Sequence, residues 1–234
     1  MPTEFHYHVD DLVFLVRPGT TDIHIIREVI TKDTYKAAGQ IEPGDIVIDV
    51  GAHIGAFALH AASLGAKVFA FEPARVNFDQ LLRNIELNGY DKDHLDYPYL
   101  RAGGKFPRYE IEAYEGGVME SEGLQTLYIR QGNFGGCSFY AKGILSEEVA
   151  TITLKKLIEA YAFGGCDFLK IDCEGAEYDI LKGFPHFDKV ERIALEYHGD
   201  PVRQKIVELL EGKGYDVTFL ANERMGHIYA EMPI

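Results

Sequence analysis

The sequence predicts an α/β protein, a three-layer sandwich with helices on both faces of a mostly parallel sheet. From residue 45 onward, short apolar runs rich in β-branched residues alternate with segments of helical periodicity. The first run, DIVIDV, is what we expect of a strand that helices cover on both faces. A glycine-rich turn follows this run, at the end of the strand where sheets of this kind bind ligands.

Two strand–helix units open the predicted sheet. Residues 45–50 form the first strand, and the small residues of 56–64 form a helix that ends at Gly65. Residues 67–71 form the second strand, and apolar residues at helical spacing then continue to residue 88. A right-handed crossover makes these two strands parallel.

The later elements continue the alternation and then close the sheet. Further strands are predicted at residues 109–114, 124–130, 167–171 and 192–197, and further helices at 153–161, 176–181 and 200–210. Residues 215–220 and 227–231 are predicted to form a closing antiparallel pair.

The first forty residues precede this pattern and are predicted to form a small element of their own. Residues 12–16 form the apolar run LVFLV, the RPGT segment is a turn, and the run IHII at 23–26 is β-branched. Together these features predict a hairpin. We therefore expect a hairpin and helix element over residues 1–40 and a single Rossmann-like domain over residues 41–234.

Composition excludes several classes of protein. With 47% hydrophobic and 26% charged residues, the 234-residue chain has the balance of a globular domain. No apolar run approaches the ~20 residues of a membrane span, and no signal peptide is recognisable. The formal charge of −14 disfavours a nucleic-acid partner, and three cysteines suggest reduced thiols in the cytoplasm. We therefore expect an enzyme that acts on a small molecule, with no nucleic-acid or membrane partner.

The turn DVGAHIG is the first candidate site. Gly51 permits the turn, and Gly55 lets the following helix start close beneath a ligand. Glu72 ends the second strand, where a carboxylate can accept hydrogen bonds from both hydroxyls of a ribose.

Two cofactors use this arrangement, and the charges favour one of them. A dinucleotide site needs a third glycine beside the pyrophosphate, but His53 fills that position here. Asp49 adds a negative charge, which is unfavourable beside a pyrophosphate and favourable beside a sulfonium and an amino group. The residues therefore favour S-adenosylmethionine over NAD, while a plain tight turn with Asp49 as a helix cap stays an alternative.

Several segments resemble the FkbM-type methyltransferase family: IDVGAHIGAFALHAASLGAKVFAFEP, NFDQLLRNIELNG, FLKIDCEGAEYDIL and ALEYH. The resemblance covers most of the chain, from about residue 20 onward. It implies the class I S-adenosylmethionine-dependent methyltransferase fold, with a mostly parallel seven-stranded sheet and an antiparallel C-terminal strand. It also implies methylation of hydroxyl groups, mostly on sugars and natural products.

The resemblance further implies which residues bind the cofactor. These are Asp49, Gly51 and His53 on the methionine side, Glu72 at the ribose, Glu112 and Ala113 at the adenine, and Asp22, Glu28 and Tyr35 in a segment that closes over the cofactor, with Ala52, Gly55 and Pro73 in the same motifs.

The chemistry is expected at the ends of two later strands. Lys170, Asp172 and Glu174 share one face if the strand stays extended, and Glu196 and His198 share a face of the next strand. An alcohol is a weak nucleophile, so its methylation needs a base or a metal nearby. We expect Asp172 and His198 to act on the acceptor hydroxyl, one of them as general base, while Glu174 holds neighbouring hydroxyls. A Mg²⁺ ion bridged by Asp172, Glu196 and His198 is a variant of this hypothesis.

Each of these assignments has a structural alternative. Lys170 could only neutralise Asp172, His198 could be a hydrogen-bonded core residue, and the acids around Glu174 could only cap a helix. The glycine- and aromatic-rich segment 131–140 is either a lid or an ordinary surface loop. Two further functions stay open: an NAD(P)-dependent oxidoreductase or epimerase on the same fold class, and a catalytically inert module that binds S-adenosylmethionine.

Overall fold

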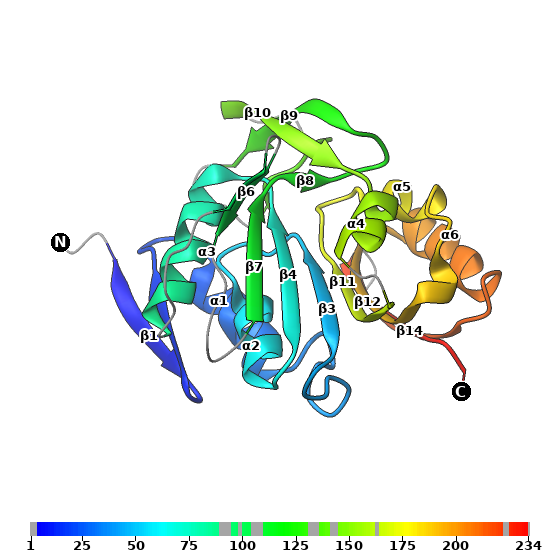
Figure 1. Cartoon of the computed structure of the whole chain (residues 1–234), viewed down its shortest axis with the longest axis horizontal. Coiled ribbons are helices and arrows are strands. Elements are labelled where there is room, and N and C mark those ends of the chain that lie inside the picture. The colour runs from blue at the N-terminus through cyan, green and yellow to red at the C-terminus, as the bar shows by residue number, and fades with distance from the viewer. Residues whose placement is uncertain are drawn as a thin grey trace.

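The central sheet is the feature that positions everything else (Figure 1). The computed structural model describes residues 4–88, 95–97, 100–103, 110–130, 136–140, 145–161, 164–221 and 225–233. Within these residues the sheet has nine strands in the order β13-β14-β12-β11-β3-β4-β7-β6-β5. Their bounds are β3 Ile46–Val50, β4 Lys67–Glu72, β5 Leu95–Tyr97, β6 Leu100–Gly103, β7 Glu110–Glu115, β11 Cys166–Ile171, β12 Val190–His198, β13 Asp216–Ala221 and β14 Met225–Glu231.

The strand directions confirm the predicted fold class. β7, β4, β3, β11 and β12 are mutually parallel, and β14 runs antiparallel to both of its neighbours, β12 and β13. Seven strands therefore follow the predicted arrangement with an antiparallel C-terminal strand. β6 and β5 extend the sheet beyond β7 as an antiparallel pair, which the sequence did not predict.

Helices cover both faces because successive residues of each strand point to opposite sides. Val47 packs in one core with the helices α2 (Ala56–Ser63) and α3 (Arg75–Leu87). Its neighbour Ile48 packs in a second core with α4 (Leu154–Tyr161), α5 (Glu177–Lys182) and α6 (Asp200–Glu211). A short 3-10 turn, η3 (Phe187–Lys189), leads from α5 into β12. The predicted three layers are therefore present.

The N-terminal element differs from the prediction in one respect. The hairpin pairs β1 (Phe5–Val9) with β2 (Leu12–Val16), whereas the run at 23–26 belongs to the helix α1 (Asp22–Ile26), which continues into the π-helical turn η1 (Arg27–Thr31). The prediction that residues 23–26 form the second strand of the hairpin is therefore wrong. The physical reason is a local anchor: both the backbone N–H and the guanidinium of Arg17 bind the Asp22 carboxylate at the start of the helix.

A second, three-stranded sheet stands beside the carboxyl end of β7 (Figure 1). β8 (Gly117–Val118) follows β7 almost directly and pairs with β10 (Leu145–Ile152), which in turn pairs with β9 (Gly123–Ile129). This small sheet extends the molecule over the edge where the predicted site lies.

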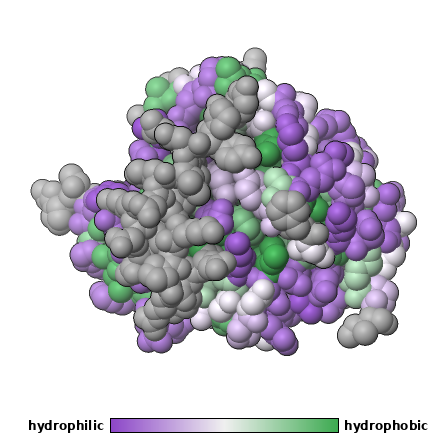
Figure 2. All heavy atoms as spheres, viewed as in Figure 1, coloured by the Kyte–Doolittle hydropathy of each residue, from purple (hydrophilic) through white to green (hydrophobic). Residues whose placement is uncertain are grey.

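The visible surface is mainly hydrophilic, with hydrophobic residues in small separate patches among those that are coloured (Figure 2). Across the described ranges, every helix is too short or too polar to cross a bilayer.

Candidate active site

Two backbone turns meet at the centre of the site. Gly51, after β3, has a φ of +82°, and a Cβ atom there would lie 1.8 Å from the carbonyl oxygen of Asp172, after β11. The Asp172 N–H donates to the Val50 carbonyl at 2.9 Å, and the N–H groups of Gly51 and Ala52 donate to the Phe71 carbonyl of β4. Glycine is therefore required at residue 51 because three strand ends converge there.

Glu72 is held at the end of β4 by donors on three residues. Its carboxylate accepts hydrogen bonds from the backbone N–H of His53 at 2.8 Å, from the N–H of Ala74 at 3.0 Å and from the side-chain amide of Asn77 at 3.2 Å. Burial nevertheless raises the pKa of Glu72 to about 7. Oε1 accepts from both Ala74 and Asn77, whereas Oε2 accepts only from His53. Because a carboxylate oxygen has two lone pairs, Oε2 keeps acceptor capacity for a ligand in the cavity.

A buried network connects the N-terminal element to this loop. Arg17 binds Asp22 and donates to the Asn77 side-chain oxygen at 3.0 Å, and its Nη2 lies 3.4 Å from Nε2 of His53. Burial lowers the pKa of His53 to about 4, so this imidazole is neutral near pH 7. Asp22 thus acts through Arg17, which orients the residues next to Glu72.

Lys170 and Asp49 form a buried ion pair. Lys170 Nζ lies 3.1 Å from Asp49 Oδ1 and donates to the Gly51 carbonyl at 2.7 Å. The parallel register of β11 and β3 places these two residues side by side. Lys170 therefore neutralises Asp49 and not Asp172, and Asp49 lies beneath the cavity rather than in its wall.

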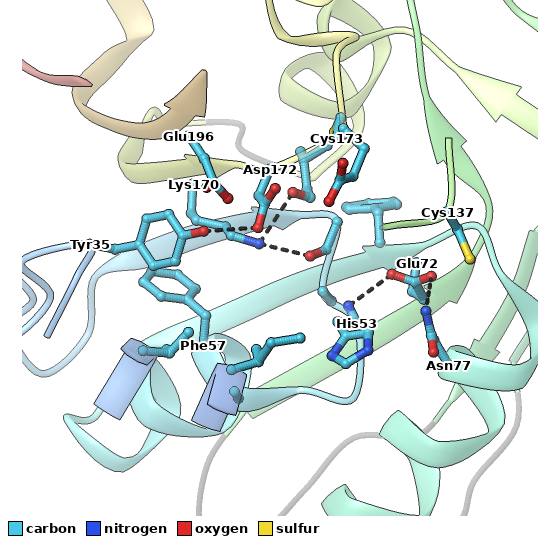
Figure 3. A pocket seen from close by; sticks show the side chains of 18 of the residues that line it. Tyr35, His53, Phe57, Glu72, Asn77, Cys137, Lys170, Asp172, Cys173 and Glu196 are labelled. Atoms are coloured by element: carbon cyan, nitrogen blue, oxygen red, sulfur yellow. Dashed lines mark hydrogen bonds between the residues drawn. The ribbon is translucent and has the colours of Figure 1, made fainter. Parts of the chain in front are cut away.

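A cavity of about 350 Å³ opens above these turns, within the range of small-ligand sites. Tyr35 points into it and donates its hydroxyl hydrogen bond to Asp172 Oδ2 at 2.9 Å (Figure 3). Glu196 lies next to Asp172 on the same side of the cavity (Figure 3). Burial and the Asp172 charge raise the pKa of Glu196 to about 8 and that of Glu174 to about 7.

Most of the predicted site residues line this cavity. They are Glu28, Tyr35, Gly51, Ala52, His53, Glu72, Pro73, Lys170, Asp172, Glu174 and Glu196. Gly55 begins α2 behind the cavity wall with a φ of +91°, and a Cβ there would meet Leu81 at 2.5 Å. Glu112 and Ala113 do not line the cavity. They lie in the middle of β7, and the cavity wall is formed farther along, by Gly117 and Val118.

His198 also lies outside the residues that line the cavity. Its Nδ1 is 3.3 Å from Glu177 Oε1, and its Nε2 is 3.5 Å from Glu174 Oε2. Burial alone would lower the pKa of His198, but the two carboxylates outweigh burial and raise it to about 9. The imidazole is therefore positively charged near pH 7, which makes it a poor general base.

The side chains predicted to hold Mg²⁺ are not arranged as a metal site. Among the described residues, no group of three or more His, Cys, Asp and Glu side chains is disposed to hold a metal ion. Both nitrogens of His198 face other carboxylates, while Asp172 is bonded to Tyr35. Asp172, Glu196 and His198 thus do not fit the predicted Mg²⁺ site, and we derive no step through a metal.

The predicted lid segment is described only from residue 136; residues 131–135 lie outside the described ranges. Ser138 donates its hydroxyl hydrogen bond to the Glu174 carbonyl at 2.9 Å, and Tyr140 donates to Asp179 at 2.5 Å. Cys137 and Phe139 line the cavity. Residues 136–140 therefore form part of the wall above Glu174.

Sequence reasoning missed three residues of this site. Asn77 and Arg17 support Glu72 through contacts that no local motif shows. His227, on β14, lines the cavity beside Tyr35, with ring centroids 5.4 Å apart. In the sequence, the one feature that pointed to His227 was its position at the start of the predicted strand 227–231.

Comparison with known proteins agrees with this geometry. The model of the family described as methyltransferase FkbM domain matches residues 49–217. The methyltransferase sdnD of Sordaria araneosa is 29% identical over 213 residues, which cover 83% of this chain and 82% of that protein. The 31-O-demethyl-FK506 methyltransferase FkbM of Streptomyces tacrolimicus is 29% identical over 218 residues, with the same two coverages. The hexuronic acid methyltransferase AglP of Haloferax volcanii is 26% identical over 174 residues, covering 73% of this chain and 63% of AglP.

Solved structures share the fold at low sequence identity. An S-adenosylmethionine-dependent methyltransferase from Agrobacterium tumefaciens has a TM-score of 0.55 at 12% identity, covering 100% of this chain and 71% of that one. The precorrin-6y C5,15-methyltransferase of Geobacter metallireducens has a TM-score of 0.52 at 12% identity, covering 87% and 88%. These similarities establish the class I methyltransferase fold, and the family match decides between the cofactors in favour of S-adenosylmethionine.

Proposed function

Because this chain belongs to the FkbM methyltransferase family and is an S-adenosylmethionine-dependent methyltransferase, we propose that it methylates a hydroxyl group of a sugar, a glycan or a glycosylated small molecule. The observation that carries the proposal is the position of Asp172. Its carboxylate stands in the cavity wall, held by Tyr35 and flanked by Glu174 and Glu196.

The residues around Gly51 fit the cofactor of this family. At Gly51 the backbone itself forms the cavity wall, and Glu72 presents a buried carboxylate whose Oε2 can accept a further hydrogen bond from a ribose hydroxyl. We assign Glu72 to the ribose, and Gly51, Ala52 and His53 to the methionine side. When bound, S-adenosylmethionine supplies a methyl group on a positively charged sulfur.

The other half of the cavity suits a polyhydroxylated acceptor. Asp172, Glu174 and Glu196 offer several oxygens close together, and carboxylates accept hydrogen bonds from adjacent sugar hydroxyls. These side chains hold the acceptor in place, and positioning alone is worth up to about 7–11 kcal/mol of the barrier.

The charges of the wall also indicate which sugars fit. Lys170 is already paired with Asp49 and does not compensate the charge of Asp172, which faces the cavity. A neutral or amino sugar is compatible with the negative charge of Asp172, whereas a sugar acid is repelled by it. The relatives are named for acceptors as different as FK506 and a hexuronic acid, so the acceptor of this chain needs its own test.

The test compares three matched acceptors: the methyl glycosides of glucose, glucosamine and glucuronic acid. We expect release of S-adenosylhomocysteine with the first two, at a kcat/KM at least tenfold above that of the glucuronide. Asp172→Asn keeps an acceptor for the Tyr35 hydroxyl but removes the negative charge, and should lower kcat at least 100-fold. The exposed control Asp188→Asn should match wild type. If all three glycosides leave release at the level without acceptor, the proposed acceptor class is wrong.

A further inference from the structure

His227 is a cavity residue for which the function above has no role. It lies on the antiparallel strand β14, directly opposite Glu196 of β12 in the register of that pair. Residues directly opposite in an antiparallel pair point to the same face of the sheet, with Cβ atoms about 4.5–5.5 Å apart. Both side chains accordingly line the same cavity, together with Asp172.

The imidazole of His227 is fixed between aromatic rings. The ring of Tyr35 meets it edge-on, with centroids 5.4 Å apart and planes at 82°, and the ring of Tyr229 stacks at 6.5 Å. Tyr35 is itself held by Asp172, and Tyr229 donates to the Thr34 carbonyl at 2.5 Å. The His227 ring is therefore presented to the cavity in a defined orientation beside Asp172.

Two other candidate bases near the acceptor already hold a proton at neutral pH. His198 holds its proton because Glu177 and Glu174 raise its pKa to about 9. Glu196 also holds a proton, because burial and Asp172 raise its pKa to about 8. Burial lowers the pKa of His227 below that of a free histidine, so its imidazole is neutral and has a free lone pair.

We propose that His227 is the general base that takes the proton of the acceptor hydroxyl. This inference rests on the proposed transfer to a hydroxyl. The hydroxyl oxygen forms a bond to the methyl carbon, the carbon–sulfur bond breaks with its electron pair left on sulfur, and the hydroxyl proton passes to a nitrogen of His227. The positive charge of the sulfonium thereby becomes the positive charge of the imidazolium, and solvent later removes the proton.

Two carboxylates offset part of the cost of burying the imidazolium that would form. The carboxylates of Asp172 and Glu28 favour the charged ring, and the positive charges of Lys170 and His198 oppose it. The titratable and charged groups that face it from neighbouring elements are Glu28 of η1, Tyr35 of the following loop, Lys170 and Asp172 at the end of β11, Glu196 and His198 of β12, and Tyr229 of β14.

The first test measures protonation without any acceptor. Protein labelled at the histidine Cε1 positions is titrated by NMR from pH 5 to pH 10, and the His227 signal is identified by its loss in His227→Asn. We expect His227 to be neutral at pH 7.5 and to take up its proton below pH 6.5. A His227 ring that is charged at pH 7.5 overturns the proposal.

The second test separates catalysis from structure. With the accepted methyl glycoside and saturating S-adenosylmethionine, His227→Asn should lower kcat at least 100-fold, within the range expected for loss of a general base. The Kd for S-adenosylhomocysteine should stay within threefold of wild type, and the matched control His8→Asn, on the exposed strand β1, should change neither value. The wild-type kcat should fall at acidic pH, and His227→Asn should lose that dependence. Retention of kcat within threefold in His227→Asn overturns the proposal.

The two hypotheses fail in distinguishable ways. If no glycoside accepts a methyl group while S-adenosylhomocysteine binds, the proposed acceptor class fails, and the NMR titration decides alone whether His227 has the protonation state of a base. If a glycoside is methylated and added imidazole restores turnover to His227→Gly, the base is confirmed. If His227→Asn methylates a glycoside at the wild-type rate, the assignment of His227 as the base fails and the proposed acceptor class stands.

Discussion

Replacement of Gly51 by alanine tests how tightly the turns after β3 and β11 are packed. The added Cβ would lie 1.8 Å from the Asp172 carbonyl oxygen and 2.9 Å from its carbon, so the two turns must separate. The left-handed backbone costs an alanine about 1–2 kcal/mol, and an overpacked contact adds roughly 1–3 kcal/mol. We expect a loss of about 3 kcal/mol in the free energy of unfolding, which lowers Tm by roughly 6–12 °C in a chain of this length.

A matched control separates the backbone cost from the clash. Gly39 has a φ of +79°, close to that of Gly51, but a Cβ there would have nothing within 4 Å. Gly39→Ala should therefore show only the backbone cost, with Tm a few degrees below wild type. Calorimetric unfolding and titration with S-adenosylhomocysteine should show Gly51→Ala both less stable than Gly39→Ala and at least tenfold weaker in binding. Equal stability and equal affinity of the two variants would refute the packing argument.

Three further predictions concern the buried ionisable groups. Lys170→Met leaves the Asp49 charge unpaired and should cost about 3–5 kcal/mol of unfolding free energy at pH 8. Protonation of Asp49 should reduce this cost at pH 5. A cost that does not depend on pH would contradict the ion pair. Tyr35→Phe removes the hydrogen bond to Asp172 and should cost about 1.5–3 kcal/mol in denaturant unfolding, whereas a neutral effect would show that the bond is not needed to hold Asp172. Burial raises the pKa of Glu72 to about 7. Since the ionised form binds the ribose, the Kd for S-adenosylhomocysteine should rise roughly tenfold from pH 8 to pH 6. A Kd that stays constant over this range would show that Glu72 does not bind the ribose.

The fold could be predicted from the sequence wherever the signal is local. The apolar run before Gly51 and the turn itself lie within one short segment, so neighbouring residues determine both the strand and its turn. The run at 23–26 misled because β-branched residues favour a strand, while the contact of Arg17 with Asp22 starts a helix there. Tertiary contacts of this kind override the local preference of a short segment.

The candidate site was harder to predict because its contacts depend on strand register. Lys170 was placed with Asp172 by counting along one strand, but the pairing of β11 with β3 sets Lys170 beside Asp49 instead. His227 was missed for the same reason: its face is determined by pairing with β12, and a shift of one residue would turn it away from the cavity. Periodicity along one strand does not reveal which partner strand lies beside it.

The position of Lys170 also changes where the negative charge of the site is located. Asp49 was expected to favour a sulfonium, but Lys170 Nζ at 3.1 Å cancels its charge beneath the cavity. The negative charge that faces the cavity therefore comes chiefly from Asp172, on the side assigned to the acceptor. In the mechanism we propose, positive charge moves from the sulfur to His227, so it stays near Asp172 before and after transfer. Because a carboxylate that stabilises both charges does not have to lose or gain a proton, Asp172 can assist each step while it remains bonded to Tyr35.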